Sequence, residues 1–514
     1  MLTRPLDIDA RPLGLVVTSI IILPGSLLVV LLIYITRAIS SGVGLTDEHK
    51  VRDRRRNHRD RDDQRYVILV TGVGMAKGLA LARAFHLCGH RVVGADFESE
   101  HIPCSGRYSK ALSNFHPLVR PADSGQTEPY VESLIEIVET EHVDLWVSCS
   151  GVGSAIEDAR AREAIERRGS CTCIQFDVET TSRLHEKDSF MREVKRLGLP
   201  APETHDIKSV DEALRILSDS ESVDPGRKFV LKPVGVDDVH RGDMTLFPLK
   251  SHSRTRKHLS RLPISPTTPW IMQEFIPGGE EYCTHALVVR GEVRCFVACA
   301  SAELLMHYRA LPSTSALSMA FLKFTREFVA RSHNPETWTG HLSFDFMVRD
   351  CEAKETDIEK KIYAIECNPR AHTAVVLFNQ YGPDTAALVD AYISALRPVR
   401  NGLDATMNGA GGHLIVPPQG TPPRYWLGHD LVTLVLHRAC LFAIGRASLG
   451  DLIGGCATFV AHVYTMKEGT FAAWDPWPAV ILYHVYWPMT ILSVWWKGGR
   501  WSRLNASTTK MFIL

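Results

Sequence analysis

Ala364-Ile-Glu-Cys-Asn-Pro-Arg-Ala-His-Thr373 is the stretch that decides the fold. Residues 361–365 predict a short apolar strand that delivers Glu366, Asn368 and Arg370 at a spacing of two. Because residues two apart in an extended chain share a face, a carboxylate, an amide oxygen and a guanidinium should lie side by side. Carboxylate and amide oxygens suit Mg²⁺, and the fixed Arg fork suits phosphate. The stretch therefore predicts a site for nucleotide phosphates.

A second strand is predicted just upstream, over Gly340–Arg349, with Asp345 at its centre between Phe344 and Phe346. Charged residues are rarely buried unless they are paired or bound to a metal. A metal ion shared with Glu366 would give Asp345 such a partner. The alternative is an exposed hairpin that carries scattered polar residues.

Phe-Asp-Phe followed by Glu-x-Asn-Pro-Arg resembles the metal end of the ATP-grasp ligases. The resemblance implies that Asp345, Glu366 and Asn368 are metal ligands that hold Mg²⁺, with Mn²⁺ as an alternative ion, against the phosphates of ATP. It also implies that Arg370 is a catalytic residue that meets phosphate or the reacting intermediate.

Two lysines extend the resemblance. Lys232 closes a strand over 229–231 immediately before a proline, where the family places a lysine that binds ATP and acts in catalysis. Lys187, in a helix predicted over 182–197, matches another ATP-binding lysine of the family; an ordinary surface lysine is the alternative. The loop 235–242 departs from the family pattern, because it carries acidic residues in place of a run of glycine or serine, and its role stays open.

The stretch Trp270–Val289 reads as two apolar strands around a Pro-Gly-Gly turn. In the family, a glutamate at the end of the first strand and the backbone after it bind adenine, and a second glutamate seven residues on binds the ribose. These positions correspond to Glu274, Phe275, Ile276 and Glu281. An exposed hairpin with ordinary glutamates is the alternative. The resemblance covers roughly residues 66–400.

The residues from Tyr66 to Asp96 form a predicted βαβ unit with Gly72-Val-Gly74 at its first turn. Glycines at this turn and an acid about twenty residues later are typical of dinucleotide binding, which leaves a nicotinamide-dependent reductase open. No tyrosine has a lysine four residues later, however, so the usual acid pair of short-chain reductases is missing. Further strands and helices predict a parallel, doubly wound α/β sheet, which resembles the Rossmann-like domain that precedes the ATP-grasp fold.

The 514 residues predict two to four domains. A formal net charge of +0 gives no support for nucleic-acid binding, and twelve scattered cysteines suit reduced thiols in the cytosol. The predicted domains are a membrane segment (1–40), a charged linker (41–65), a Rossmann-like domain (66–180), an ATP-grasp domain (181–400) and a Trp-rich hydrophobic C-terminal region (401–514).

Residues 13–36 contain no charged side chain and are long enough to span a bilayer. Arginines are concentrated after this segment, so the positive-inside rule predicts a single-pass membrane protein whose catalytic part is cytosolic. A buried or hairpin-like segment that does not cross is the alternative. Seven of the ten tryptophans follow residue 401, near the apolar stretches 431–453 and 478–496. They suit either the bilayer interface or a packed aromatic cap.

The family resemblance implies a ligase that uses ATP to phosphorylate an oxygen of a small-molecule acceptor, after which an amine, such as an amino acid, displaces the phosphate. The stretch Asp475–His484 and Lys510 are similar to mycosporine-glycine synthases, which would make glycine the amine and 4-deoxygadusol the acceptor. The alternatives are a carboxylate–amine ligase with a dipeptide-like product, a membrane-anchored NAD(P) reductase and a non-catalytic membrane scaffold. The oligomeric state stays open.

Overall fold

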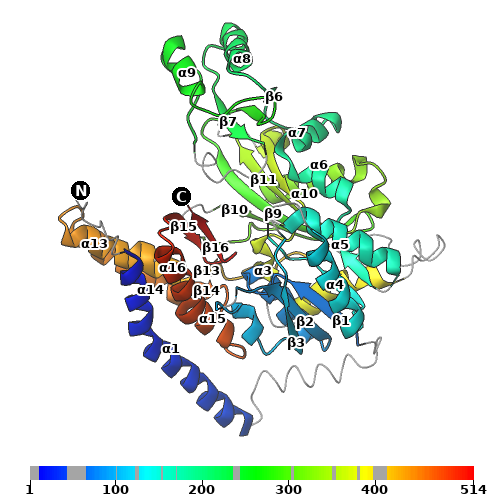
Figure 1. Cartoon of the computed structure of the whole chain (residues 1–514), viewed down its shortest axis with the longest axis vertical. Helices are drawn as coiled ribbons and strands as arrows, with labels where there is room; N and C mark the ends of the chain where they lie inside the picture. Colours follow the sequence, from blue (N-terminus) through cyan, green and yellow to red (C-terminus); the bar gives the residue numbers. More distant parts are fainter. Residues whose placement is uncertain are drawn as a thin grey trace, which may run out of the picture.

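The computed structural model describes residues 11–42, 65–99, 101–121, 127–151, 154–169, 171–234, 243–301, 306–349, 355–378, 383–397 and 414–513. The acidic loop 235–242 and nearly all of the charged linker lie outside these residues. The chain is a mixed α/β protein with one long apolar helix near its N-terminus (Figure 1).

A five-stranded sheet in the order β3-β2-β1-β4-β5, parallel throughout, organises the first part of the chain. Its elements are β1 (Val67–Thr71), α3 (Ala76–Leu87), β2 (Arg91–Phe97), η1 (Ser105–Tyr108), β3 (Asn114–Leu118), α4 (Glu128–Glu141), β4 (Leu145–Val147), α5 (Ala155–Arg168) and β5 (Thr172–Ile174). One face of β1 packs toward α3 and the other toward α4, so the strand is apolar throughout. The predicted parallel, doubly wound sheet is therefore confirmed, although β3 was not predicted.

Two antiparallel sheets follow (Figure 1). The smaller one, in the order β6-β8-β7, comprises β6 (Thr204–Ile207), β7 (Phe229–Pro233) and β8 (Trp270–Glu274), with α8 (Val210–Val223) and α9 (His252–Leu259) packed beside it. The larger one, in the order β10-β9-β11-β12, comprises β9 (Glu280–Val289), β10 (Glu292–Ala300), β11 (Gly340–Val348) and β12 (Ile362–Asn368). Its apolar side packs on α7 (Lys187–Arg196) and α10 (Ala316–Arg331).

The helix predicted over 182–197 is in fact two helices. Helix α6 covers Val178–His185 and α7 begins at Lys187, because Glu186 between them has extended backbone angles (φ −80°, ψ 129°). The hydroxyl of Ser189 lies within hydrogen-bond distance of the carbonyls of Arg183 (2.9 Å) and Glu186 (3.1 Å), and the Glu186 carbonyl also accepts from the Phe190 N–H (2.9 Å) as the first turn of α7. As a result Lys187 is the first residue of α7.

The C-terminal region consists of two long helical segments and a β-hairpin. The first segment runs through α12 (Leu427–Asp430), η7 (Leu431–Leu436) and α13 (His437–Ala443), and α14 (Leu449–Thr465) then folds back beside it. The second segment comprises α15 (Trp477–Ile481), η8 (Leu482–Tyr486) and α16 (Trp487–Trp496), and β15 (Trp501–Asn505) pairs with β16 (Lys510–Ile513). Both η7 and η8 are π-helical. We call residues 427–465 the helical hairpin.

Helix α1 (Arg11–Gly42) packs along the second of these segments (Figure 1). The Ser19 hydroxyl donates to the Tyr483 carbonyl (2.9 Å), and the Trp477 indole donates to the Tyr34 hydroxyl (3.1 Å). The Ser26 hydroxyl lies 2.8 Å from Nε2 of His484. Such polar contacts are typical of packed apolar helices. Helix α1 is, by length and composition, the candidate membrane span in the part of the chain that the structure describes.

A buried ion pair joins the C-terminal region to the first domain. Arg83 of α3 lies 2.9 Å from the carboxylate of Asp475 and also donates to the carbonyls of Thr470 (2.7 Å) and Asp475 (2.8 Å). The same carboxylate accepts hydrogen bonds from the Ser109 hydroxyl and the Lys110 amide. The Trp-rich region is therefore fixed to α3 by a fully buried network.

Candidate active site

Four of the predicted polar residues lie on one face of the larger antiparallel sheet. Asp345 of β11 pairs with Glu366 of β12, and Asn368 follows two residues later. Met347, two residues beyond Asp345, pairs with Glu281 of β9. Paired residues in an antiparallel sheet, and residues two apart in a strand, point to the same side. Glu281, Asp345, Glu366 and Asn368 therefore share a face.

Hydrogen bonds connect the end of β12 to this face. The Asn368 amide donates to Oδ2 of Asp345 at 3.2 Å, and its oxygen accepts from Nη2 of Arg370 at 2.8 Å. The backbone N–H of Arg370 also donates to the Asn368 carbonyl at 2.8 Å, so the chain turns where β12 ends. This turn brings the guanidinium back to the amide, whereas the spacing had predicted an extended chain through Arg370.

The two predicted lysines lie close to this face. Nζ of Lys232 donates to Oε1 of Gln273 at 2.8 Å. Burial lowers the pKa of Lys232, and the charges that act on it next belong, in order, to Glu366, Lys187, Glu281 and Asp345. These four charges belong to α7, β9, β11 and β12, so the structure places the predicted acidic and basic residues near one another.

The side chain of Glu274 is not directed to this group. In the pairing of β7 with β8, Lys232 lies opposite Ile271, whereas Glu274 lies opposite Phe229 on the other face of the sheet. Its two carboxylate oxygens accept hydrogen bonds from Arg227 (2.9 Å) and Arg349 (3.0 Å).

Gln273, the neighbour of Glu274, is the residue that reaches Lys232. The alternation of side chains along β8 was the signal for it. Phe275 is half-buried and its N–H donates to the Lys228 carbonyl (2.8 Å), while Ile276 is buried. Of the predicted adenine contacts in this stretch, the backbone of residues 274–276 stays a candidate, whereas the Glu274 side chain does not.

Lys77 was not assigned a role from the sequence. It is buried near the start of α3, and its Nζ donates to the carbonyls of Ser150 (3.0 Å) and Ala371 (2.9 Å). Burial, followed by the charge of Arg370, lowers the pKa of Lys77 to about 7. Lys77 therefore connects the first domain to the loop that carries Arg370 and adds a second cation there.

Three buried polar atoms near these residues make no hydrogen bond to any described part of the chain: Nδ1 of His185, Nε2 of His285 and Oγ of Ser343. Ser343 lies opposite Asn368 in the sheet, on the face of Asp345. Nδ1 of His285 accepts from the backbone N–H of His372, and burial lowers the pKa of His285 to about 3. Buried polar groups without partners are costly, which indicates a polar ligand at this face.

The glycine turn of the first domain is occupied by protein groups. The N–H of Gly74 donates to Oδ2 of Asp96 at 2.7 Å, and the N–H of Ala76 donates to the carbonyl of Ser507 at 2.9 Å. A Cβ added to Gly106 would lie 2.1 Å from the Val73 carbonyl oxygen, so η1 is packed directly on the turn. The amide at the start of α3 and Asp96 near the end of β2 would otherwise hold a pyrophosphate and a ribose.

The donor set at the shared face suits a magnesium ion. Carboxylate and amide oxygens are the ligands that Mg²⁺ prefers, and Asp345, Glu366 and Asn368 present them together. The oxygen of the Asn368 amide has a second lone pair beyond its bond to Arg370, and the Ser343 hydroxyl lies on the same face. Lys232 and Arg370 supply the cations that a polyphosphate would need.

No protein-family model matches the chain, and no curated protein does. Among solved structures it is similar to the L-amino acid ligase from Bacillus licheniformis, with 15% identity and a TM-score of 0.44 over 65% of this chain and 74% of that one. It is similar to the N5-carboxyaminoimidazole synthetase from Staphylococcus aureus, with 12% identity and a TM-score of 0.46 over 65% and 78%. It is also similar to the phosphoribosylamine–glycine ligase from Thermotoga maritima, with 17% identity and a TM-score of 0.43 over 66% and 78%. Because these values are low, function is inferred from the side chains of this chain.

Proposed function

We propose that the chain is an ATP-dependent ligase of the ATP-grasp type that forms a C–N bond. In this reaction the γ-phosphoryl group of ATP passes to an oxygen of a small-molecule acceptor, and an amine then displaces the phosphate. The observation that carries the proposal is the shared face of Glu281, Asp345, Glu366 and Asn368, on which the Asn368 amide donates to Asp345 and accepts from Arg370. Carboxylates and cations that lie close together suit phosphoryl transfer. That reaction depends on positioning and charge neutralisation and needs no protein nucleophile.

Each predicted residue except Glu274, whose side chain is held by Arg227 and Arg349, has a role in this proposal. Asp345, Glu366 and Asn368 would hold Mg²⁺, which neutralises charge on the phosphates when bound. Lys232 and Lys187 would bind phosphate oxygens, and Arg370 would orient the transferred group. Glu281 would bind the ribose, and the backbone at Phe275 and Ile276 would bind adenine.

The acceptor would lie toward Lys77 and His285. Nε2 of His285 is a buried atom that makes no hydrogen bond to the described chain, and Lys77 is a charged group that acts on this imidazole. Burial lowers the pKa of His285, so this imidazole is neutral at pH 7; because its Nδ1 accepts from the His372 N–H, its Nε2 carries the proton and can donate a hydrogen bond. The arrangement favours an acceptor that carries an anionic oxygen, such as a carboxylate or an enolate.

A more specific version of the proposal names the two substrates, with glycine as the amine and 4-deoxygadusol as the acceptor. It relies on the likeness of Asp475–His484 to mycosporine-glycine synthases, but Asp475 binds Arg83 and His484 contacts α1, so neither side chain serves the acceptor. A carboxylate–amine ligase with a dipeptide-like product suits the site equally well.

The NAD(P) reductase is not favoured. The groups that would receive a pyrophosphate and a ribose are already engaged. The Gly74 N–H donates to Asp96, and the Ala76 N–H donates to the Ser507 carbonyl. A dinucleotide would have to displace both η1 and the β-hairpin formed by β15 and β16, which carries Ser507.

We also infer that the chain is attached to a membrane through α1 and the helical hairpin, which lie on the same side of the molecule (Figure 1). Large apolar side chains are exposed on both, including Ile21 (70%), Ile444 (64%), Ile453 (59%) and Tyr464 (85%). A large exposed apolar surface on a stable protein marks an interaction site, and a bilayer would cover both helices at once. The cytosolic orientation rests on the arginines that follow α1.

The test is ATP turnover by the full chain in detergent micelles, supplied with pools of acids and amines. We expect release of ADP and phosphate only when both an acid and an amine are present, with a drop of at least about a hundredfold in Glu366→Gln. Glu359→Gln is the matched control, because Glu359 is exposed and forms an ion pair with Lys323 at the surface. Turnover that survives in Glu366→Gln, or NAD(P)H binding without ATP binding, would contradict the proposal.

A further inference from the structure

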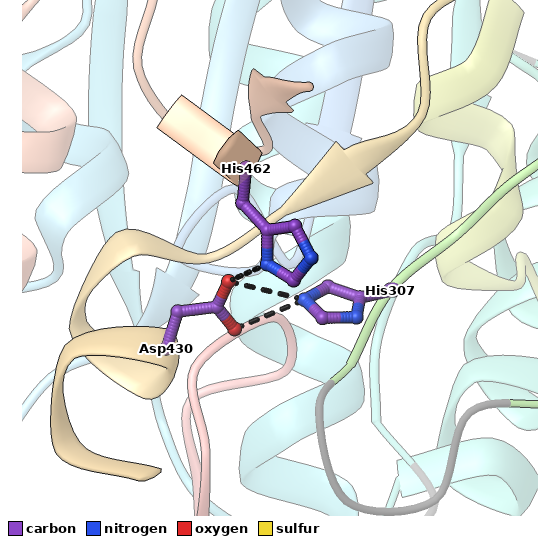
Figure 2. Close-up of side chains that lie close together, drawn as sticks. All are labelled: His307, Asp430 and His462. Carbon is purple, nitrogen blue, oxygen red and sulfur yellow. Dashed lines mark hydrogen bonds and ion pairs between the residues drawn. The ribbon is translucent and has the colours of Figure 1, made fainter. Parts of the chain in front are cut away.

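Two histidines and an aspartate from three separate segments meet outside the candidate active site (Figure 2). His307 lies before α10, Asp430 is the last residue of α12, and His462 belongs to α14. Nε2 of His307 lies 3.0 and 3.1 Å from the two oxygens of Asp430, and Nδ1 of His462 lies 2.7 Å from Oδ2. The centres of the two rings are 4.6 Å apart, and the ring planes are nearly perpendicular, at 80°. One nitrogen of each ring points to the carboxylate (Figure 2).

The carboxylate in this cluster is fully buried. The side chain of Asp430 is 0% exposed, while those of His307 and His462 are 17% and 14% exposed. Among the residues that the structure describes, no lysine or arginine forms an ion pair with Asp430. An imidazole cancels a buried negative charge only when it is protonated, and burying such a charge is costly. A bound cation would cancel it.

We propose that His307, Asp430 and His462 bind a divalent transition-metal ion of the Zn²⁺ type. Imidazole nitrogens suit Zn²⁺, Fe²⁺ and Ni²⁺, whereas Mg²⁺ and Ca²⁺ prefer oxygen ligands. Three protein ligands leave a fourth position on the metal ion for water. The two histidines are partly exposed, so this position would be open to solvent.

The distances need little change to accept the ion. Zn²⁺ bonds of about 2.0–2.2 Å at tetrahedral angles separate neighbouring ligand atoms by about 3.3 Å. The nitrogen–oxygen separations of 2.7 to 3.1 Å would therefore open by only a few tenths of an ångström. All three ligand atoms already lie within 4.8 Å of one another.

The local backbone sets these side chains in place. Met306, directly before His307, has a left-handed φ of 49°, which a non-glycine residue adopts only at a cost. Asp430 is followed at once by the π-helical turns of η7, a form that is frequent at functional sites. Both irregularities lie next to a ligand residue.

The ion would join the membrane-facing hairpin to the catalytic core. Residue 308, next to His307, pairs with Arg424 through two backbone hydrogen bonds of 2.8 and 3.0 Å. The ring of Tyr308 also packs against His372, two residues from Arg370, with the ring centres 5.8 Å apart. The metal would thus lock α12 and α14 onto the segment that borders the candidate active site.

The test is the metal content of the full chain in micelles after equilibration with Zn²⁺ alone, followed by replacement with Co²⁺ and visible spectroscopy. We expect one Zn²⁺ per chain and the d–d absorption of a low-coordinate Co²⁺ site. His462→Gln and Asp430→Asn should weaken binding at least about tenfold, because each removes a ligand. His437→Gln, which alters an exposed histidine of the same hairpin, should bind normally.

The Glu366→Gln variant separates this ion from one at the candidate magnesium site, since it should keep its Zn²⁺. Zn²⁺ should also protect the turn at 444–448 from proteolysis in the unaltered chain, a readout that needs no variant. The proposal is overturned if the unaltered chain binds no Zn²⁺, or if Asp430→Asn and His437→Gln bind it equally. The triad would then be an internally hydrogen-bonded cluster.

Discussion

Breaking the buried pair of Arg83 and Asp475 should cost the C-terminal region a large part of its stability. In Asp475→Ala, a guanidinium that is 3% exposed would lose the carboxylate 2.9 Å away. Removing one partner of a buried ion pair costs about 3–5 kcal/mol, because the remaining charge stays buried. The Ser109 hydroxyl and the Lys110 amide also lose their acceptor, so we expect the upper half of that range.

Intrinsic fluorescence of the full chain in micelles measures this loss during denaturation. Seven of the ten tryptophans follow residue 401, so the signal reports mainly on the region that Asp475 anchors. The unfolding midpoint of that region should fall sharply in Asp475→Ala. In the double variant Arg83→Met/Asp475→Leu it should recover in part, because an apolar pair leaves no buried charge.

Asp206→Ala is the matched control. Asp206 pairs with Arg192 at 2.8 Å, but the two side chains are 47% and 57% exposed, so the loss should stay below about 1 kcal/mol. The reasoning is wrong if Asp475→Ala is no more damaging than Asp206→Ala. It is also wrong if the double variant is as unstable as the sum of its two single changes.

Three further outcomes are expected. Lys232→Met should weaken ATP binding at least about tenfold in calorimetry, because it removes a charged donor, whereas Lys228→Met should not. The folded pKa of Lys77, about 7, lies below its ordinary 10.5, so its contribution to stability is present above pH 10.5 and is lost as pH falls toward 7. Lys77→Met should therefore flatten the rise in melting temperature between pH 7 and 9, and an unchanged slope would contradict the burial argument. Ile453→Asp should reduce flotation of the chain with anionic vesicles, and unchanged flotation would place the hairpin outside the bilayer.

The parallel sheet could be predicted because its signals are local. Apolar strands alternate with amphipathic helices over 66–180, whereas β3, Asn114–Leu118, has no apolar run and was missed. The shared face of Asp345 and Glu366 could be expected for the same reason, since a spacing of two within an apolar run defines a strand face. Only the pairing of β11 with β12 was needed to bring the two carboxylates together.

The remaining features depend on partners that are distant in sequence. Lys77 binds carbonyls 73 and 294 residues away, and Glu274 is held by arginines 47 and 75 residues away. No periodicity encodes such contacts. The break at Glu186 was missed because no interruption of the helical pattern marks it; in the structure the Arg183 carbonyl accepts from the Ser189 hydroxyl at the break.

Helix α3 is the element that connects these parts. Its first turn receives the Ser507 carbonyl, Lys77 on the same turn reaches the loop of Arg370, and Arg83 near its other end binds Asp475. A displacement of the C-terminal region would therefore act on α3 at both ends and reach Ala371 through Lys77. Since the same region packs on α1, we infer that attachment of α1 to a membrane would hold α3, and with it the loop of Arg370, in the geometry described here.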